Sequence, residues 1–230
     1  MTGAPRTATQ WSGFRPLLLG ATLAAIAGWV DTVGFVGLHG LFIAHVTGNF
    51  VLLGAGLVAG GGGFVAKLLV LPVFVAGVAC AGCLHAFPGR RPAAAGLLLE
   101  LAGLSCFLAA AVLAAPIDAG GANYGLPLLA ACAGAFAMGV QSAQSRLSLM
   151  GATTAMTGNV TQLVLEAMGA LGLVPAQRDH ARKRMLKILA PVAGFAAGCF
   201  SGGLAYLAWS FWALLAPMAV LCALVCLAPE

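Results

Sequence analysis

Three acidic side chains lie inside strongly apolar stretches of this 230-residue chain: Asp31, Glu100 and Glu166. Ionisable groups in membrane-like surroundings are costly and are functional candidates by default. We expect Asp31 to bind a proton or a cation, or else to be a structural partner of a nearby hydroxyl group or of Arg146. Glu100 lies only a few residues into its stretch, so we expect its side chain to reach the interface with water.

Glu166 belongs to a polar face on a predicted helix. Asn159, Gln162 and Glu166 follow the spacing i, i+3 and i+7, which places all three on one side of an α-helix. Polar side chains are unfavourable toward lipid, so this face is expected to point into the protein.

A second polar stripe lies on a later apolar helix and comprises Gln141, Gln144, Ser145 and Ser148. Such a stripe either lines a water-filled pathway or forms hydrogen bonds between helices, each contributing about 0.6 kcal/mol. Both interpretations stay open from the sequence.

The same tripeptide, Thr-Gly-Asn, occurs twice, as Thr47, Gly48 and Asn49 and as Thr157, Gly158 and Asn159. Threonine or asparagine can cap the helix that follows, and glycine permits close approach of another backbone or a ligand. Exposed amides at that helix start could bind an anion or a carbonyl oxygen. The alternative is that the tripeptide is only a cap and a packing notch between closely crossed helices.

Few residues suggest metal or enzyme chemistry. Cys80 and Cys83 have the spacing of a metal or redox pair, but no second cysteine pair lies nearby, so we interpret them as packing residues. His45 is interpreted as a hydrogen-bonding structural group, and Ala155 replaces it in the second copy. With no nucleophile–base pair and no nucleotide-binding loop, we expect no enzyme, no cofactor and no metal site.

Composition places the chain in a lipid bilayer. Hydrophobic residues make up 61% and charged residues 7%, whereas a soluble domain carries about 25% charged residues. The 11 basic and 6 acidic side chains cannot cover a globule of this size. Nucleic-acid-binding modules and soluble enzymes are therefore excluded, and the expected partners are lipid, an unknown small solute or ion, and a second copy in a homodimer.

Six segments are long and apolar enough to cross a membrane. They are residues 17–38, 64–84, 95–115, 125–145, 186–207 and 210–228. The two Thr-Gly-Asn segments, 42–59 and 153–174, open with polar residues, and we expect short or re-entrant helices there. The predicted fold class is an all-α integral membrane protein with a single membrane domain.

The two halves of the chain, about 17–115 and 125–228, resemble each other. At the offset of 110 residues that relates the two tripeptides, Asp31 corresponds to Gln141. Further on, similar apolar segments align Pro72 with Pro191 and Cys80 with Cys199. Three ordered matches predict an internal repeat.

Basic residues indicate how the repeats are oriented, because Lys and Arg collect in cytoplasmic loops. If every segment crosses, eight of the 11 basic residues lie inside; if both Thr-Gly-Asn segments enter and return, only Lys67 lies outside. The second arrangement fits better and puts the N-terminus in the cytoplasm. Each half then makes three crossings, so the repeats are predicted to be inverted, an architecture recurrent in transporters.

These segments resemble the YoaK-type bacterial inner-membrane proteins, a family defined by a domain of unknown function. The resemblance covers nearly the whole chain and rests on an ordered first block of Gly28, Asp31, Gly34, Phe42 and the first tripeptide, and on a second block around Gln141 and Arg146. Ser142 stands where relatives favour asparagine. The resemblance implies a bacterial inner-membrane protein and supplies no substrate.

The leading functional hypothesis is a small secondary transporter or permease with a midplane site at Asp31, the two tripeptides, Gln141 and Glu166. The alternative is a non-transporting membrane scaffold or assembly factor, in which the tripeptides and glycines serve packing alone. The transporter hypothesis in this form requires Thr47, Asn49, Thr157 and Asn159 to converge near mid-membrane beside a polar cavity, and it fails if they lie apart on lipid-facing or loop surfaces.

Overall fold

The computed structural model describes residues 15–86, 91–117, 123–147, 153–154, 156–173 and 178–227, with side chains placed from residue 17 and, in the last segment, from residue 184. All regular structure in these ranges is helical, which confirms the predicted all-α class. The helices are α1 (Arg15–Gly37), α2 (Gly48–Ala59), α3 (Phe64–Ala86), α4 (Pro92–Ala114), α5 (Gly125–Leu147), α6 (Met156–Ala170), α7 (Arg178–Trp209), the 3-10 turn η1 (Ser210–Leu214) and α8 (Leu215–Leu227).

Five stretches of the described chain are long and apolar enough to cross a membrane: parts or all of α1, α3, α4 and α5, and one stretch of 44 residues, Arg184–Leu227. A helix of 23 residues is about 35 Å long, slightly more than the hydrocarbon core. The long stretch contains the last two segments predicted from the sequence. Its helix is broken at Ser210, whose φ of 51° lies in the left-handed region.

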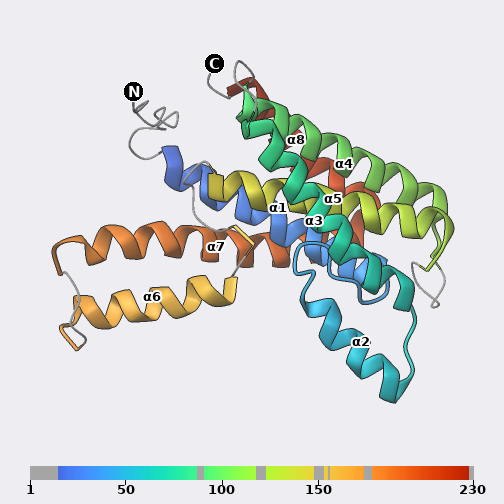
Figure 1. Ribbon diagram of the computed structural model, residues 1–230, viewed down its shortest axis with the longest axis horizontal. Helices are drawn as coiled ribbons and strands as arrows, with labels where there is room; N and C mark the ends of the chain where they lie inside the picture. The colour runs from blue at the N-terminus through green and yellow to red at the C-terminus, as the bar shows by residue number, and fades with distance from the viewer. Residues whose placement is uncertain are drawn as a thin grey trace.

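The bundle is built from close helix pairs, α1 along α7 and α3 and α4 along α5 (Figure 1). Glycines permit these contacts. A Cβ at Gly194 or Gly198 of α7 would overlap the carbonyl oxygen of Ala21 or Ala25 on α1. The glycine steps of α7 therefore pack within the protein, where the backbones approach closely.

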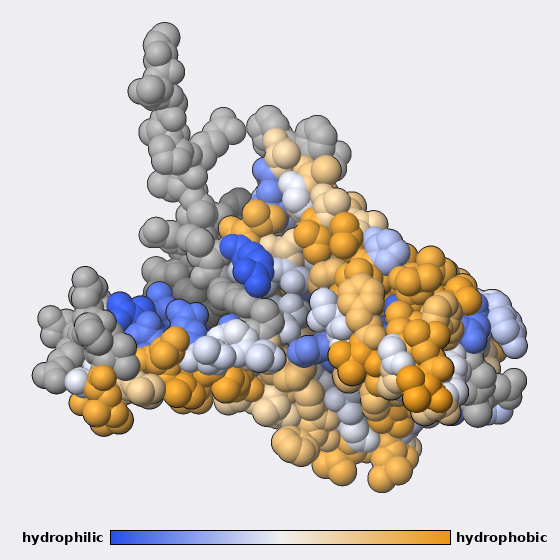
Figure 2. Space-filling model, turned by 60° about the horizontal axis from the view of Figure 1, so that its bottom comes forward, coloured by the Kyte–Doolittle hydropathy of each residue, from blue (hydrophilic) through white to orange (hydrophobic). Residues whose placement is uncertain are grey.

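The two short helices extend away from the bundle in different directions (Figure 1). α2 contacts α3, and α6 lies along α7. Several large apolar side chains are exposed on these helices and on the bundle, including Leu57, Val58, Leu204 and Leu207. The face in Figure 2 carries broad apolar areas over much of its surface. An exterior of this kind is suited to lipid contact.

Candidate functional site

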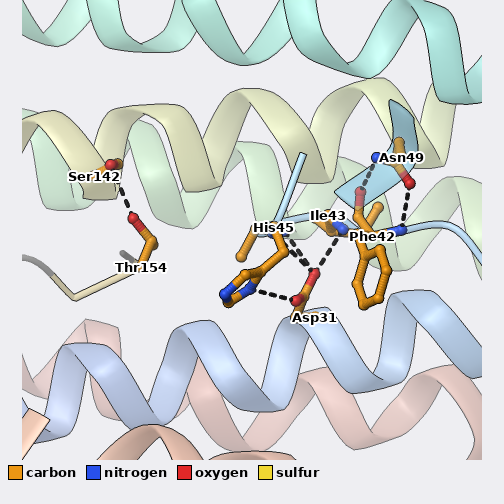
Figure 3. A network of polar contacts seen from close by, with 8 residues as sticks. Asp31, Phe42, Ile43, His45, Asn49, Ser142 and Thr154 are labelled. Carbon is orange, nitrogen blue, oxygen red and sulfur yellow. Dashed lines mark hydrogen bonds and ion pairs between the residues drawn. The ribbon is translucent and has the colours of Figure 1, made fainter. Parts of the chain in front are cut away.

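Asp31 of α1 holds an irregular segment, residues 38–47, inside the bundle. Its Oδ1 accepts hydrogen bonds from the backbone amides of Ile43 and Ala44, both at 2.7 Å (Figure 3). The side chain is buried. Backbone groups without a helical partner are costly in apolar surroundings, so the carboxylate makes it possible to bury this loop.

The His45 ring pairs with the second oxygen of the same carboxylate. Its Nδ1 lies 2.9 Å from Oδ2 of Asp31, and its ring meets Phe195 of α7 edge to face at a centroid distance of 5.1 Å. The hydrogen bond to Asp31 raises the pKa of His45 above its usual value, although burial acts in the opposite direction. When an imidazole is bonded through Nδ1, its other ring nitrogen, Nε2, can still bind a second partner. His45 therefore has the structural partner that the sequence suggested, in a form that can also change its charge.

Asn49 fixes the far end of the loop. Its Oδ1 accepts from the amide of Phe42 at 3.0 Å, and its Nδ2 donates to the carbonyl oxygen of Phe42 at 2.8 Å. Asn49 is completely buried. Gly48 allows the Phe42 ring to approach, because a Cβ there would lie 2.9 Å from the ring. The glycine and asparagine of the first tripeptide thus bind a neighbouring loop residue.

Two sequence expectations for this tripeptide fail. Thr47 precedes α2 without capping it through its side chain, and the hydroxyl-bearing residue is exposed. The first amides of α2 are also engaged, since Gly48 donates to the carbonyl of His45 and Asn49 to that of Val46. These two amides are not exposed for an anion to bind.

Ile43 anchors the middle of the loop between two helices. The side chain is fully buried, and it fills space left by Gly34 of α1 and Gly134 of α5. A Cβ at Gly134 would lie 2.9 Å from Cγ2 of Ile43. The loop is therefore held by a carboxylate, an amide and an apolar wedge.

The second half has a related arrangement. Gln141 of α5 is buried, donates from Nε2 to the carbonyl of Leu23 at 2.7 Å, and lies 3.4 Å from Oγ1 of Thr153. Beside it, the hydroxyls of Ser142 and Thr154 are 3.0 Å apart (Figure 3). Thus in each half the first helix binds a segment 12 to 13 residues further along.

The second tripeptide does not have the environment of the first. Thr157 is exposed, no atom lies within 4 Å of a Cβ built at Gly158, and Asn159 is half-buried with its Nδ2 4.0 Å from Sδ of Met156. The helices α2 and α6, both described in full, make no contact with each other. The structure therefore does not bring the two tripeptides together.

The structure also places the two other acidic residues that the sequence singled out. Glu166 of α6 forms an ion pair with Arg184 of α7, with Oε1 2.8 Å from Nε. Glu100 was expected at the water interface, and this prediction is wrong, since the residue is completely buried. The reason is that α4 begins at Pro92, earlier than the predicted start at residue 95, so Glu100 lies about 12 Å along the helix.

A half-open pocket of about 300 Å³ lies beside the Asp31–His45 pair. It is formed by α1, the loop and α7, and its lining residues are Asp31, Thr32, Phe35, Phe42, His45, Phe195 and Cys199. The walls are largely aromatic, and one corner holds the ionisable side chains of Asp31 and His45. Asn49, Gln141, Glu166 and the second tripeptide lie outside this lining, so only Asp31 of the predicted site residues belongs to it.

The sequence indicated no role for Phe42 beyond its place in the family pattern. It also did not predict that the backbone amides of Ile43 and Ala44 would bind Asp31. One signal was present: a buried acidic residue shortly before a polar, nonhelical stretch needs donors, and main-chain amides supply them. Within the described residues, no group of three or more His, Cys, Asp or Glu side chains is arranged to hold a metal ion.

Long apolar helices, apolar exposed surfaces and a polar site inside the bundle define a multi-pass membrane protein. The chain belongs to the family described as "Protein of unknown function (DUF1275)", whose model matches residues 19–227. No curated protein and no solved structure matches the chain.

Proposed function

We propose that the protein is a small secondary transporter or permease of the bacterial cytoplasmic membrane, and that its solute binds in the pocket beside Asp31 and His45. The observation that carries the proposal is the pocket itself, in which an ion-paired carboxylate and imidazole form one corner of a largely aromatic cavity. Buried ionisable groups in membrane helices commonly belong to solute or proton pathways.

The proposed architecture is an inverted repeat of three crossings in each half. Two features support it. The first helix of each half packs along the second long helix of the other half, α1 on α7 and α5 on α3. Each first helix also binds the segment that precedes its own tripeptide, through Asp31 in one half and Gln141 and Ser142 in the other. Inverted repeats place their sites where the halves meet.

The six-crossing topology requires that α2 and α6 enter the membrane without crossing it. α2 has 12 residues, about 18 Å of helix, which is shorter than the hydrocarbon core. The loop before α2 is buried in protein, the condition under which irregular backbone is tolerated at membrane depth. The N-terminus is then cytoplasmic.

The pocket walls define the class of solute. Phe35, Phe42 and Phe195 offer apolar contact, and His45 offers one hydrogen bond or one positive charge. A compact, mostly apolar molecule with a single polar or anionic group fits this chemistry. Both Asp31 oxygens already have partners, so the imidazole is the group that can offer a charge to the solute.

A scaffold or assembly factor that transports nothing is the second candidate, and a specific observation favours it. The two tripeptides lie on helices that do not touch, and Asn49 is fully occupied with Phe42. In this alternative Asp31 and Asn49 only hold the loop. We also propose that the protein is not an enzyme and needs no cofactor.

The experiment that separates the two candidates begins with the purified full chain. A library of small organic acids and neutral solutes is screened for thermal stabilisation, and hits are tested for uptake into proteoliposomes with and without a pH gradient. We expect His45→Ala to abolish binding and uptake, while His85→Ala leaves both unchanged, because His85 bonds only the Ala81 carbonyl of its own helix. Uptake that is equal in both variants would remove the pocket from the mechanism.

A further inference from the structure

Glu100 lies in surroundings that offer its carboxyl group no hydrogen-bond partner among the described residues. The residue is completely buried on α4, and neither Oε1 nor Oε2 has a hydrogen-bond partner among the described residues. Buried carboxyl groups in proteins are ordinarily paired or hydrogen-bonded, since an isolated ionised carboxylate is very costly in an apolar environment. This group does not contribute to the pocket beside Asp31.

The register of α4 against α5 brings a second unpartnered oxygen to the same level. The side chain of Gln144 occupies the space at Gly96, and Gly103 faces Ala137, so residue numbers rise along α4 as they fall along α5. This antiparallel register places Glu100 opposite the stretch that contains Gln141. Gln141 is buried, its Nε2 is engaged with the Leu23 carbonyl, and its Oε1 has no partner in the described structure.

No charged group on the described helices around α4 neutralises Glu100, because neither of its oxygens has a partner there. The ionisable residues on the described elements packed against α4 are Lys67, Cys80, Cys83 and His85 on α3, Cys132 and Arg146 on α5, and Cys222 and Cys226 on α8. Lys67 donates to the Gly62 carbonyl at 2.6 Å, and Arg146 is exposed at the end of α5. Of the remaining groups, only His85 could carry a positive charge, and its ring is bonded to the Ala81 carbonyl.

We propose that Glu100 and Gln141 Oε1 form an intramembrane site for one monovalent cation, either a proton or an alkali ion. The three unpartnered acceptor oxygens need a donor or a positive charge, and one carboxylate balances one charge. Carboxylate and amide oxygens are the ligands that hard cations and protons use in membrane proteins. The site lies between α4 and α5, apart from the solute pocket, and its occupancy can be tested without any solute.

The test is infrared spectroscopy of the purified full chain in detergent. The carbonyl band of a protonated carboxyl is distinct from carboxylate bands, and Glu100→Gln, which preserves size and neutral hydrogen bonding, identifies the Glu100 contribution by difference. The band is followed between about pH 5 and about pH 9, first with N-methylglucamine as the only added cation and then with Na⁺ or K⁺. Glu166→Gln is the matched control and should leave the titrating band unchanged.

Each outcome decides the proposal. A band that disappears as pH rises, whatever the salt, supports a proton site. A band displaced by Na⁺ or K⁺ at constant pH supports an alkali-ion site. A band that neither pH nor salt changes identifies a permanently neutral structural acid and overturns the proposal. Absence of the band under all conditions identifies a permanently ionised carboxylate and overturns it as well.

The contribution of Gln141 to the cation site is tested separately. We expect Gln141→Leu to weaken apparent proton or alkali-ion affinity about tenfold, because it removes one oxygen from the site. Gln144→Leu is the control, since the Gln144 amide is directed toward the Pro92 carbonyl at 3.3 Å. Equal titrations in the two variants would exclude Gln141 from the site.

Discussion

The Asp31 carboxylate has two separate tasks, one for each oxygen. Oδ1 accepts from three backbone amides of the loop, those of Ile43 and Ala44 at 2.7 Å and that of His45 at 3.4 Å, and Oδ2 pairs with the His45 ring at the edge of the pocket. The first task is structural, and the second sets the charge and orientation of an imidazole. Substitutions can separate these tasks, because an asparagine keeps an acceptor oxygen for the loop but loses the negative charge that pairs with His45, whereas an alanine keeps neither.

Replacement of Asp31 by alanine should be more damaging than replacement by asparagine. Asp31→Ala leaves two buried amides without an acceptor, at a cost of about 1–3 kcal/mol each, whereas Asp31→Asn keeps one acceptor oxygen. Thermal unfolding in detergent, with Glu166→Ala as a control at a less buried ion pair, measures the difference. Equal stability of both Asp31 variants would show that the loop does not depend on this acceptor.

His45 should make stability depend on pH. Its pKa is raised in the folded protein by the bond to Asp31, so the ion pair's contribution is complete below the unfolded value of about 6.5 and is lost as pH rises through the folded pKa. The melting temperature of the wild-type chain should therefore fall over this window relative to that of His45→Gln. Parallel pH profiles for the two proteins would contradict the prediction.

At the scale of elements, glycine determines which helices can pair. α7 approaches α1 so closely that a Cβ at Gly198 would overlap the Ala25 carbonyl. The same kind of contact joins α3 and α5, where Gly77 meets the carbonyl of Phe136 and Gly139 that of Phe74. The α1–α7 contacts position Phe195 of α7 on one wall of the pocket and Asp31 of α1 on the other.

Gly198→Ala should therefore force α1 and α7 apart, with a loss of about 1–3 kcal/mol in stability. Gly82→Ala is a matched control on α3, because no atom lies within 4 Å of its added Cβ. That variant should be neutral or more stable by about 0.5–1 kcal/mol, since alanine favours helix. Unfolding of both variants under the same conditions gives the comparison, and similar losses would argue against tight packing at Gly198.

The helices were largely predictable from the sequence, and the site only in part. Apolar length predicted α1, α3, α4 and α5 to within a few residues, and the cost of a buried charge identified Asp31. The partners of Asp31 were not predictable, because the amides of Ile43 and Ala44 carry no side-chain signature. The burial of Glu100 was missed because the helix start was placed three residues late, which moved the carboxylate toward the interface.

At the scale of the whole molecule, the proposed inverted arrangement makes a prediction about sidedness. In a cysteine-free background, single cysteines at the exposed positions Gly61 and Tyr124 should react with an impermeant reagent added outside the cell. A cysteine at Leu173, also exposed, should react only after the membrane is opened. Labelling of Gly61 from the cytoplasm would mean that α2 crosses the membrane and that the repeats are not inverted.

The pairing of α1 with α7 also has a consequence for biosynthesis. Trp29 of α1 donates to the carbonyl of Ala213, 184 residues later in the chain, and the glycine-lined contact with α7 is equally remote in sequence. The first helix therefore leaves the ribosome long before its partner exists. Until the last quarter of the chain is made, the surface of α1 that makes these close contacts with α7 therefore has no partner from its own chain.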